Sequence, residues 1–278
     1  MSLHFKILYI ITYLVFNMDF ITAIISGILQ GIFEWLPISS QGNLLGLFTI
    51  IGSNPQEALK LAVMLHIGTL LSATIYFRKE ILELVLSLKL KLINKKENKN
   101  WDLTKFLIIA TLATSITAIP SYLFLKNFLG TNTSFVLMLL AGLLIITGAL
   151  QLFKKVKGSG ELNIKNAILV GLGQGFSILP GISRSGTTTS FLAFSGFTPQ
   201  KAFRISFLLS IPAVLVAELG FGLIEGFLID EFAIIALIFA FIVGIFSMDL
   251  LIKIAHKINF AYFCFALAII YIIAFLVI

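Results

Sequence analysis

Long apolar runs separated by short polar segments dominate this sequence. Six runs are able to cross a bilayer as helices, because each keeps about 20 mostly apolar residues together, as a hydrocarbon core of ~30 Å requires. The runs are continuous and do not alternate with a period of two, so they predict helices and argue against a β-barrel. They lie at roughly 57–77, 103–125, 134–153, 203–223, 232–252 and 260–278.

Two further apolar segments, 20–52 and 166–200, are interrupted in the middle by proline and small polar residues. Each half has only about 13–16 residues, which is short for a membrane crossing. Irregular backbone is tolerated at membrane depth where it is buried in protein or lines a wet cavity. We therefore expect both segments to be re-entrant helical hairpins, in an all-α polytopic membrane protein with six transmembrane helices.

The two interrupted segments resemble each other. The first contains GILQGIFEWLPISSQG from Gly27, and the second contains GLGQGFSILPGISRSG from Gly171. An odd number of crossings lies between them, so the second copy should be inverted relative to the first, and the broken elements should meet near the midplane. We expect a single integral membrane domain at 18–278, with repeat units at about 18–125 and 134–278. Residues that match at an offset of 144 are Gln30 with Gln174, Gly31 with Gly175, Ser39 with Ser183, and Gly42 with Gly186.

Composition and charge support the membrane class and suggest an orientation. The chain has 278 residues, of which 59% are hydrophobic and 12% charged, and its mean hydropathy is +1.05. The net charge of +7 does not indicate a nucleic-acid partner, because the basic residues gather in short loops, which marks the cytoplasmic side. Loops 78–105 and 154–165 are rich in lysine, whereas 126–133 and 224–231 together carry one. This asymmetry predicts a multi-pass protein of the cell membrane with an external C-terminus.

The first 17 residues and the single cysteine give little further information on fold or function. Residues 1–17 are apolar but short and lack a small-residue cleavage site, which argues against a signal peptide. We treat them as an N-terminal extension, and a start of the protein at Met18 or an additional partial span are both open. The single cysteine, Cys264, excludes an internal disulfide and is expected to serve packing. A homodimer is left open by the sequence.

Few ionisable residues remain inside the apolar segments, and a charge within the bilayer is a candidate for function because it is costly. Glu34 and Arg184 lie in the two interrupted segments, at places that we interpret as equivalent in the repeat, so we expect them to pair. Glu218 and Asp249 lie near the ends of their runs. We expect Glu218 to reach toward the membrane surface and Asp249 to pair with Lys253.

One histidine, His66, lies in the middle of an apolar run. Hydrogen bonding between helices and a contact with the site are both open for its side chain.

The stretch GISRSGTT, residues 181–188, combines features of a phosphate-binding site. Arg184 offers a planar fork of donors that suits a phosphate oxyanion. The preceding Pro-Gly permits a sharp turn, after which a helix would direct free N–H groups at the same anion. Several hydroxyl side chains follow. The alternative is a polar helix break that packs against another helix, with Arg184 paired to Glu34.

The segments QGIFEWLPISSQGN and LPGISRSGTTTS resemble the two signature regions of the undecaprenyl-diphosphate phosphatase family, the bacitracin-resistance proteins. Members show (Glu/Gln)-x-x-x-Glu, then Leu-Pro-x-Ser-Ser-x-Gly, and later Pro-Gly-x-Ser-Arg-Ser-x-x-Thr. The resemblance runs from about Met18 to the end of the chain. It implies paired re-entrant hairpins and removal of the terminal phosphate from a C55 polyprenyl diphosphate, which regenerates the monophosphate lipid carrier. It also implies a divalent metal ion, Mg²⁺ or Ca²⁺.

The resemblance further implies roles for individual residues. Arg184 would bind the phosphates, and Ser40 is the candidate nucleophile. Glu34 would hold the metal or act on a water or hydroxyl, with Gln30 as a second metal ligand. The residues expected to contact the diphosphate are Gln30, Ser39, Asn43, Gly181, Ser183, Ser185 and Thr188.

Two positions depart from the pattern of the family. Many members have glutamate where this chain has Gln30, which keeps a ligating oxygen but cannot act as a base, so Glu34 is the better base candidate. Many members have histidine where this chain has Asn43, and we interpret that position as one that orients the site. A polyprenyl-phosphate flippase is the main alternative function, because inverted repeats with broken helices are typical of transporters. A non-catalytic paralogue is a weaker alternative.

Overall fold

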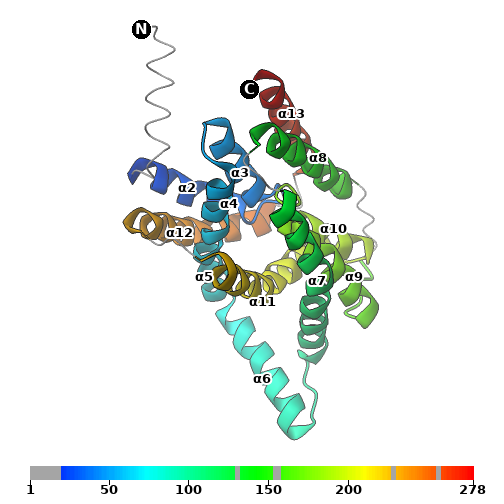
Figure 1. Ribbon diagram of the computed structural model, residues 1–278. Coiled ribbons are helices and arrows are strands. Elements are labelled where there is room, and N and C mark those ends of the chain that lie inside the picture. Colours follow the sequence, from blue (N-terminus) through cyan, green and yellow to red (C-terminus); the bar gives the residue numbers. More distant parts are fainter. Residues whose placement is uncertain (1–19, 129–131, 153–157, 227–229, 255–257) are drawn as a thin grey trace, which may run out of the picture.

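The computed structural model describes residues 20–128, 132–152, 158–226, 230–254 and 258–278 (Figure 1). Within these ranges the regular elements are all helices, as expected, and the N-terminal extension at 1–17 lies outside them. The elements are α2 (Phe20–Phe33), α3 (Ser40–Ile50), α4 (Pro55–Met64), α5 (His66–Tyr76), α6 (Arg78–Asn94), α7 (Trp101–Phe128), α8 (Thr133–Leu152), α9 (Ile164–Gly175), the short 3₁₀ helix η1 (Phe176–Ile178), α10 (Arg184–Phe194), α11 (Pro199–Glu225), α12 (Glu231–Ile254) and α13 (Ala261–Val277).

Five helical stretches among the described residues are long and apolar enough to cross a membrane, and they coincide with five of the six expected crossings. In the region of the sixth, α13 is an apolar helix of 17 residues. The chain is therefore a multi-pass helical membrane protein, because only helices with internally satisfied backbones are stable at these lengths in lipid. The five stretches are Pro55–Tyr76, Trp101–Asn127, Thr133–Leu152, Pro199–Glu225 and Glu231–Ile254.

Two expectations about continuity need correction. The stretch at 55–76 is not one helix, because α4 ends at Met64 and α5 begins at His66. The lysine-rich segment 78–105, expected as a loop, contains the whole of α6 and the start of α7. Leucines alternate with lysines and glutamates through α6, all of them good helix formers, so local propensity favours the helix there.

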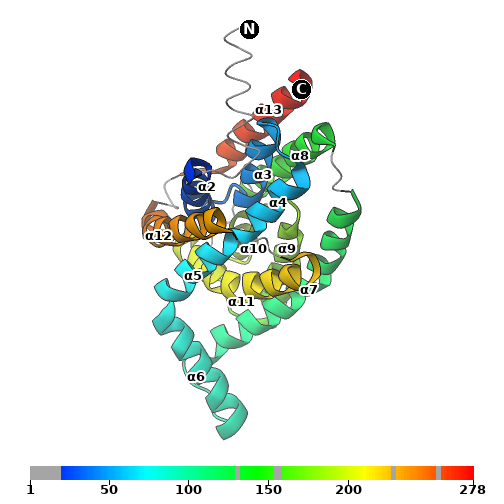
Figure 2. The same ribbon diagram turned by 60° about the vertical axis from the view of Figure 1, so that its left-hand side comes forward.

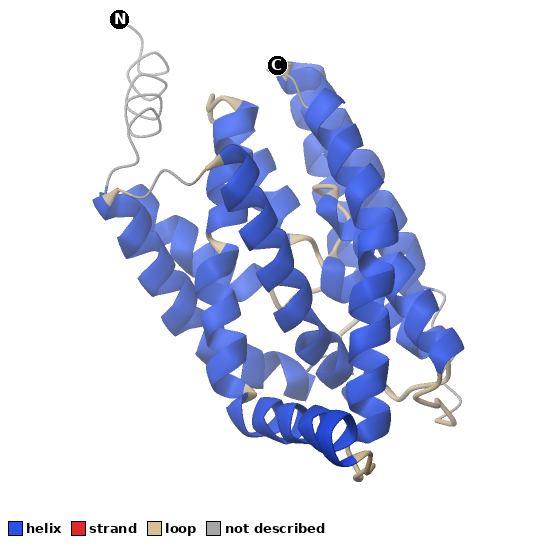
Figure 3. Cartoon of the chain, turned by 60° about the horizontal axis from the view of Figure 1, so that its bottom comes forward, coloured by secondary structure: helices blue, strands red, loops and turns tan. Residues whose placement is uncertain are grey.

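Both interrupted segments fold as two short helices joined by a break. In the first, α2 and α3 flank the break, and in the second, α9 with η1 precedes the break and α10 follows it. The helix after each break begins at a serine cap, since Ser39 accepts from the backbone N–H of Gly42 and Ser183 accepts from that of Gly186. Several loop segments lie inside the helical body and not at its ends (Figure 3).

The short helix that opens each interrupted segment packs against a long helix of the other half. α2 packs on α12, beside which it lies in Figures 1 and 2, and α9 packs on α7. A Cβ added at Gly27 would overlap the carbonyl oxygen of Ala236, and one added at Gly171 would overlap that of Ala110. Another close glycine follows four residues later in both helices. This spacing of small residues lets two backbones approach within a membrane, where packing drives helix association.

We expect Gly171→Ala to lower the free energy of unfolding by about 1–3 kcal/mol, because the added methyl group must push α9 away from α7. Gly142→Ala on α8 is the matched control, since an added Cβ there meets nothing within 4 Å. Thermal unfolding of the purified variants in detergent, followed by circular dichroism, measures the difference. Equal midpoints for the two variants would contradict the close α9–α7 contact.

Candidate functional site

The second interrupted segment places an arginine at a helix N-terminus. After η1 the chain turns at Gly181, whose φ of 108° is in the region that favours glycine. Thr147 on α8 holds this turn, because its hydroxyl donates to the Gly181 carbonyl at 2.8 Å and accepts from the Ser183 N–H at 3.1 Å. Ser183 caps α10, so Arg184 is the first residue of that helix.

The first interrupted segment has the same construction and is tied to the second. Ser39 caps α3, and Ser40 is the first residue of that helix. Ser39 has a φ of 66°, a left-handed conformation that is uncommon for a residue other than glycine. Its hydroxyl oxygen also accepts from the backbone N–H of Gly181 at 3.0 Å. The strained serine therefore joins the two breaks directly.

The repeat relates a different pair of residues from the one we expected. At the offset of 144, the counterpart of Arg184 is Ser40, and both begin the helix after a break. Glu34 lies instead before the first break, directly after α2. The interpretation of Glu34 and Arg184 as equivalent places is therefore wrong in register. The first half therefore contributes a carboxylate and a hydroxyl to one cluster, and the second half contributes a guanidinium.

Glu34 is the centre of a buried cluster that draws on both halves of the chain. Its Oε1 lies 2.5 Å from Nη2 of Arg184, so the expected pairing is confirmed. Its Oε2 accepts from the Ser40 hydroxyl at 2.6 Å and from the Gln30 amide at 3.1 Å. Nε2 of His66 lies 3.2 Å from the same oxygen. Glu34 is only 7% exposed, and these partners supply the donors that a carboxylate needs away from water.

His66 belongs to this cluster, although its role was left open by the sequence. Its Nδ1 lies 2.8 Å from the carbonyl oxygen of Ala62 and 3.0 Å from that of Val63, and its Nε2 faces the carboxylate. Carbonyl and carboxylate oxygens only accept, so a doubly protonated ring satisfies both nitrogens. The signal in the sequence was a polar ring in the middle of an apolar run, which is a functional candidate by default.

The guanidinium of Arg184 also contacts an aromatic ring. The guanidinium lies 6.0 Å from the ring centroid of Trp35, a cation–π contact. Trp35 is buried, donates from its indole nitrogen to the Gly244 carbonyl at 2.9 Å, and packs edge-on against Phe207. The position after Glu34 was not among the expected site residues, and its apolar character hides it among core aromatics.

The hydroxyls of the second break brace the start of α10. Ser183 and Ser185 lie 3.3 Å apart through their oxygens, and Ser185 donates to the Leu36 carbonyl at 3.1 Å. Thr188 donates to the Arg184 carbonyl at 2.8 Å and shares a hydrogen bond of 2.5 Å with Ser206. These bonds fix the backbone that carries Arg184. Direct contact of these hydroxyls with a diphosphate stays a prediction.

Asn43 is engaged with the backbone of the first break. Its amide nitrogen donates to the carbonyls of Ile38 and Ser39 at 2.8 and 2.9 Å. Its Oδ1 accepts from the Tyr271 hydroxyl at 3.2 Å. The side chain thereby holds the strained Ser39 in place, which agrees with the interpretation of this position as one that orients the site.

Glu218 and Asp249 differ in their surroundings. Asp249 pairs with Lys253 at 2.6 Å, as expected. Glu218 does not reach the surface, because it is only 7% exposed, and it is near enough to His66 and Glu34 to interact electrostatically with both. The expectation that Glu218 reaches the surface is wrong, because the side chain is buried on α11, which packs against α5.

Some buried polar atoms in and beside the cluster have no hydrogen-bond partner in the part of the chain that the structure describes. They include two acceptors, Oε1 of Gln30 and Oε2 of Glu218, and one donor, Nη1 of Arg184. An unpaired buried polar atom is costly, so such atoms indicate where a ligand binds. Free acceptors and a free donor around one cluster fit a ligand that combines a cation with an oxyanion.

The oxygens in the cluster suit a hard cation. Glu34 offers a carboxylate and Gln30 a free amide oxygen, whereas the described residues contain no group of three or more His, Cys, Asp or Glu placed to hold a metal. Mg²⁺ is commonly held by one or two protein oxygens together with water and substrate phosphates. The residues present therefore fit an ion that completes its coordination from a diphosphate.

The family model and the similar proteins of known name point to the same family. The sequence model of the family described as bacitracin resistance protein BacA matches residues 23–273. An undecaprenyl-diphosphatase from Methanococcoides burtonii is 39% identical over 254 residues, which cover 89% of this chain and 95% of the relative. Proteins of the same name from Haloarcula marismortui and Methanothrix thermoacetophila are 38% and 35% identical. These alignments cover 88% and 91% of this chain, and 93% and 96% of the relatives.

Proposed function

The chain belongs to the bacitracin resistance protein BacA family, and on this basis we propose that it is a phosphatase of the cell membrane. It hydrolyses a polyprenyl diphosphate of the undecaprenyl type to the monophosphate lipid carrier and inorganic phosphate. The observation that carries this function is the buried cluster in which Arg184 of the second break meets Glu34 of the first. The relatives, which are named for the diphosphatase activity and align over nearly their whole length, favour hydrolysis over the flippase alternative.

Arg184 is the anchor for the phosphates. One of its terminal nitrogens is engaged by Glu34 and the other has no described partner, so the guanidinium has a free donor for a phosphate oxygen. The N-termini of α3 and α10 also begin at the breaks, at Ser40 and Arg184. Helix N-termini carry partial positive charge, which stabilises an anion placed there.

Ser40 and Glu34 have the geometry of a nucleophile and its base, at 2.6 Å. In the proposed reaction, the Ser40 hydroxyl or a water beside it attacks the terminal phosphorus, and its proton passes to Glu34. The bond from that phosphorus to the bridging oxygen breaks, and the lipid monophosphate leaves. If Ser40 attacks, water then releases the phosphate from the serine. Positioning and charge neutralisation dominate in phosphoryl transfer, which suits a site built from fixed donors.

We propose that Glu34 and Gln30 hold a divalent cation, Mg²⁺ or Ca²⁺, with the substrate. When bound, the cation supplies neutralisation of the charge on the phosphate oxygens. Gln30 contributes through its free Oε1 while its amide nitrogen orients Glu34.

Many members of the family have a histidine at the position of Asn43. In this chain His66, from a different helix, supplies an imidazole to the cluster. Its Nε2 approaches Glu34 on Oε2, whereas Arg184 approaches on Oε1. A phosphate that takes the place of the Glu34 carboxylate in these two contacts would accept hydrogen bonds from His66 on one side and from Arg184 on the other. We therefore propose His66 as a residue that holds the diphosphate opposite Arg184.

For the membrane arrangement, we propose six crossings, two re-entrant hairpins of inverted orientation and an external C-terminus. The exchange of packing partners supports this, because α2 of the first half packs on α12 and its counterpart α9 packs on α7. The lysine asymmetry of the loops supports the orientation.

Arg184→Lys keeps the charge but loses the planar fork, so turnover should fall ~30- to 1,000-fold, the equivalent of about 2–4 kcal/mol of transition-state stabilisation. Glu34→Gln should be similarly inactive, and Ser183→Ala, which removes one hydroxyl, should be milder. The measurement is phosphate release from long-chain polyprenyl diphosphate by purified protein in detergent, where no second compartment exists. Near-normal turnover of Arg184→Lys would contradict the phosphate anchor, and absence of release by the parent protein would favour the flippase.

His66→Gln keeps one donor but removes the ring, and we expect turnover to fall roughly 10- to 100-fold, as for loss of one oxyanion donor. Ser72→Ala on the same helix is the control, because its hydroxyl bonds only to backbone carbonyls of Gly68 and Phe241 among the described residues. It should lower thermal stability while sparing turnover. If both variants changed stability alone, His66 would serve packing.

Removal of the metal should abolish turnover, because the diphosphate charge exceeds what the site cations offset. Excess chelator followed by graded Mg²⁺ or Ca²⁺ measures the requirement. Gln30→Leu should raise the half-saturating metal concentration about tenfold or more through loss of one ligating oxygen. Full turnover in excess chelator would remove the metal from the mechanism.

Single cysteines placed in 126–133 and in 154–165 should react with membrane-impermeant reagents from opposite sides, because one crossing separates them. Cys264 is buried and is replaced by serine in these variants. Labelling of both positions from the same side would exclude the inverted arrangement.

A further inference from the structure

Helix α6 lies across the end of the helical body. It follows α5 after Phe77 and leads into α7, and both neighbours belong to stretches long enough to cross a membrane. In Figure 1 it lies at the opposite end of the molecule from the C-terminus. In Figure 3, where the bottom of Figure 1 is turned forward, α6 is the foremost helix at the lower edge and runs across the lower ends of two upright helices. With 17 residues and many charges, α6 is unsuited to crossing the bilayer itself.

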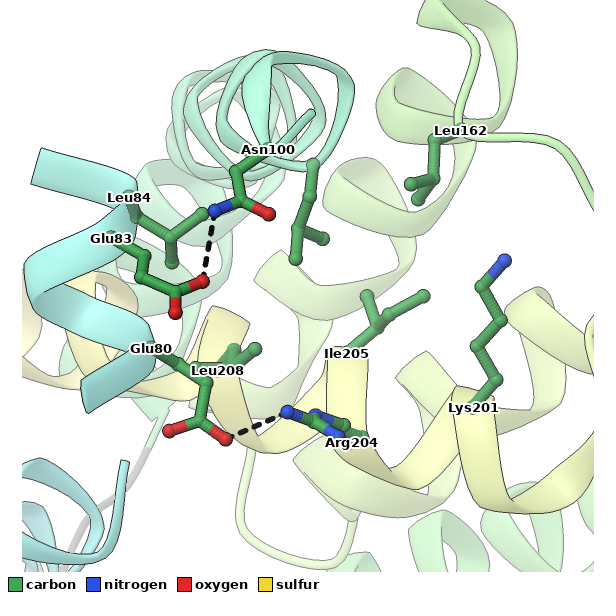
Figure 4. Close-up of a pocket in the computed structure, with 10 residues that line it drawn as sticks. Glu80, Glu83, Leu84, Asn100, Leu162, Lys201, Arg204, Ile205 and Leu208 are labelled. Carbon is green, nitrogen blue, oxygen red and sulfur yellow. Dashed lines mark hydrogen bonds and ion pairs between the residues drawn. The ribbon is translucent and has the colours of Figure 1, made fainter. Parts of the chain in front are cut away.

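The polar side of α6 faces the protein. Figure 4 shows Glu80 paired with Arg204 of α11 at 2.7 Å and Glu83 accepting from Asn100 at 2.9 Å. One turn further on, the buried Ser87 donates to the side chain of Asn98 at 2.7 Å. A pocket of about 290 Å³ lies between this side of α6 and α11. The two acidic residues of α6 therefore bond to α11 and to the start of α7.

The outward side of α6 is mostly apolar, with Lys89 at its centre. Leu82 is followed three and four residues later by Val85 and Leu86, and Leu92 and Ile93 come two helical turns after that pair, so all five share one helix face, opposite the one that carries Glu80, Glu83 and Ser87. Each is between 52% and 71% exposed. Soluble surface helices show the reverse pattern, and a contiguous exposed apolar face indicates an apolar neighbour. The residues are Leu82, Val85, Leu86, Leu92 and Ile93.

Lysines accompany this apolar face. Lys89 lies in its centre, where a long side chain can extend its ammonium toward water while its stem stays in lipid. Lys95, Lys96 and Lys99 follow at the end of the helix, and Lys91 pairs with Glu97. Segment 78–100 has seven basic and three acidic residues. The charge complements an anionic surface and not a basic one.

We propose that α6 is an interfacial helix whose apolar face enters the acyl region of the leaflet on the lysine-rich side and whose lysines bind anionic lipid headgroups. An apolar face combined with flanking lysines is the pattern of helices that lie in the membrane surface. The partner is the anionic lipid surface, and a second copy of the chain on the same face is the competing occupant. The inference is independent of the catalytic reaction.

Full-length protein with Cys264→Ser and single spin labels along 80–94 tests the position of the helix in vesicles of phosphatidylcholine with phosphatidylglycerol. Accessibility to oxygen, which concentrates in lipid, should peak at 82, 86 and 93 and repeat with the helical period. Greater accessibility of those sites to a water-soluble nickel reagent would overturn the proposal. Dipolar coupling between labels at 86 on two copies would also overturn it and assign the face to self-association.

The amount of phosphatidylglycerol that stays bound to the protein after extraction tests whether the lysines of α6 bind anionic headgroups. Lys89→Gln should weaken retention about fivefold, the contribution of one lysine near an anionic surface. Lys60→Gln is the matched control, an exposed lysine on α4 whose loss should leave retention unchanged. Equal retention by both variants would reject anionic lipid as the partner of α6.

Discussion

The ion pair between Arg184 and Glu34 is the constraint on which the structure depends. A lone guanidinium or carboxylate costs at least ~2.5–3.5 kcal/mol at membrane depth on insertion scales, so pairing lowers the cost of burying both residues. They are 150 residues apart in the chain and 2.5 Å apart in space. The two breaks must therefore meet, and the packing of the halves has to bring them together.

Two features of the backbone make this meeting possible. Glycines on α2 and α9 allow each opening helix to lie directly against a long helix of the other half, which interleaves the halves. The Ser39 hydroxyl then accepts from Gly181 across the junction, and Thr147 secures the same turn. Ser39 therefore both caps α3 and links the two breaks.

Much of the fold follows from the sequence because lipid imposes simple rules. Continuous apolar runs predicted the crossings, and the scarcity of intramembrane charge predicted that Glu34 pairs with Arg184. The interruption before His66 was missed, because no proline or glycine marks it and apolar periodicity continues through it. The burial of Glu218 was missed for a related reason, since depth along a run says nothing about which neighbours cover it. Glu218 lies on α11, which packs against α5, and that contact is not visible in the sequence.

The amide side chain of Gln30 suits the electrostatics of the cluster. A glutamate there would place a second carboxylate one helical turn from Glu34, with His66 and Arg184 as the nearby cations, and like charges at that distance repel. The amide of Gln30 instead donates to Glu34 at 3.1 Å, which an ionised carboxylate cannot do. Its Oε1 has no hydrogen-bond partner among the described residues. Gln30 thus orients the central carboxylate with its nitrogen without adding a second negative charge to the cluster.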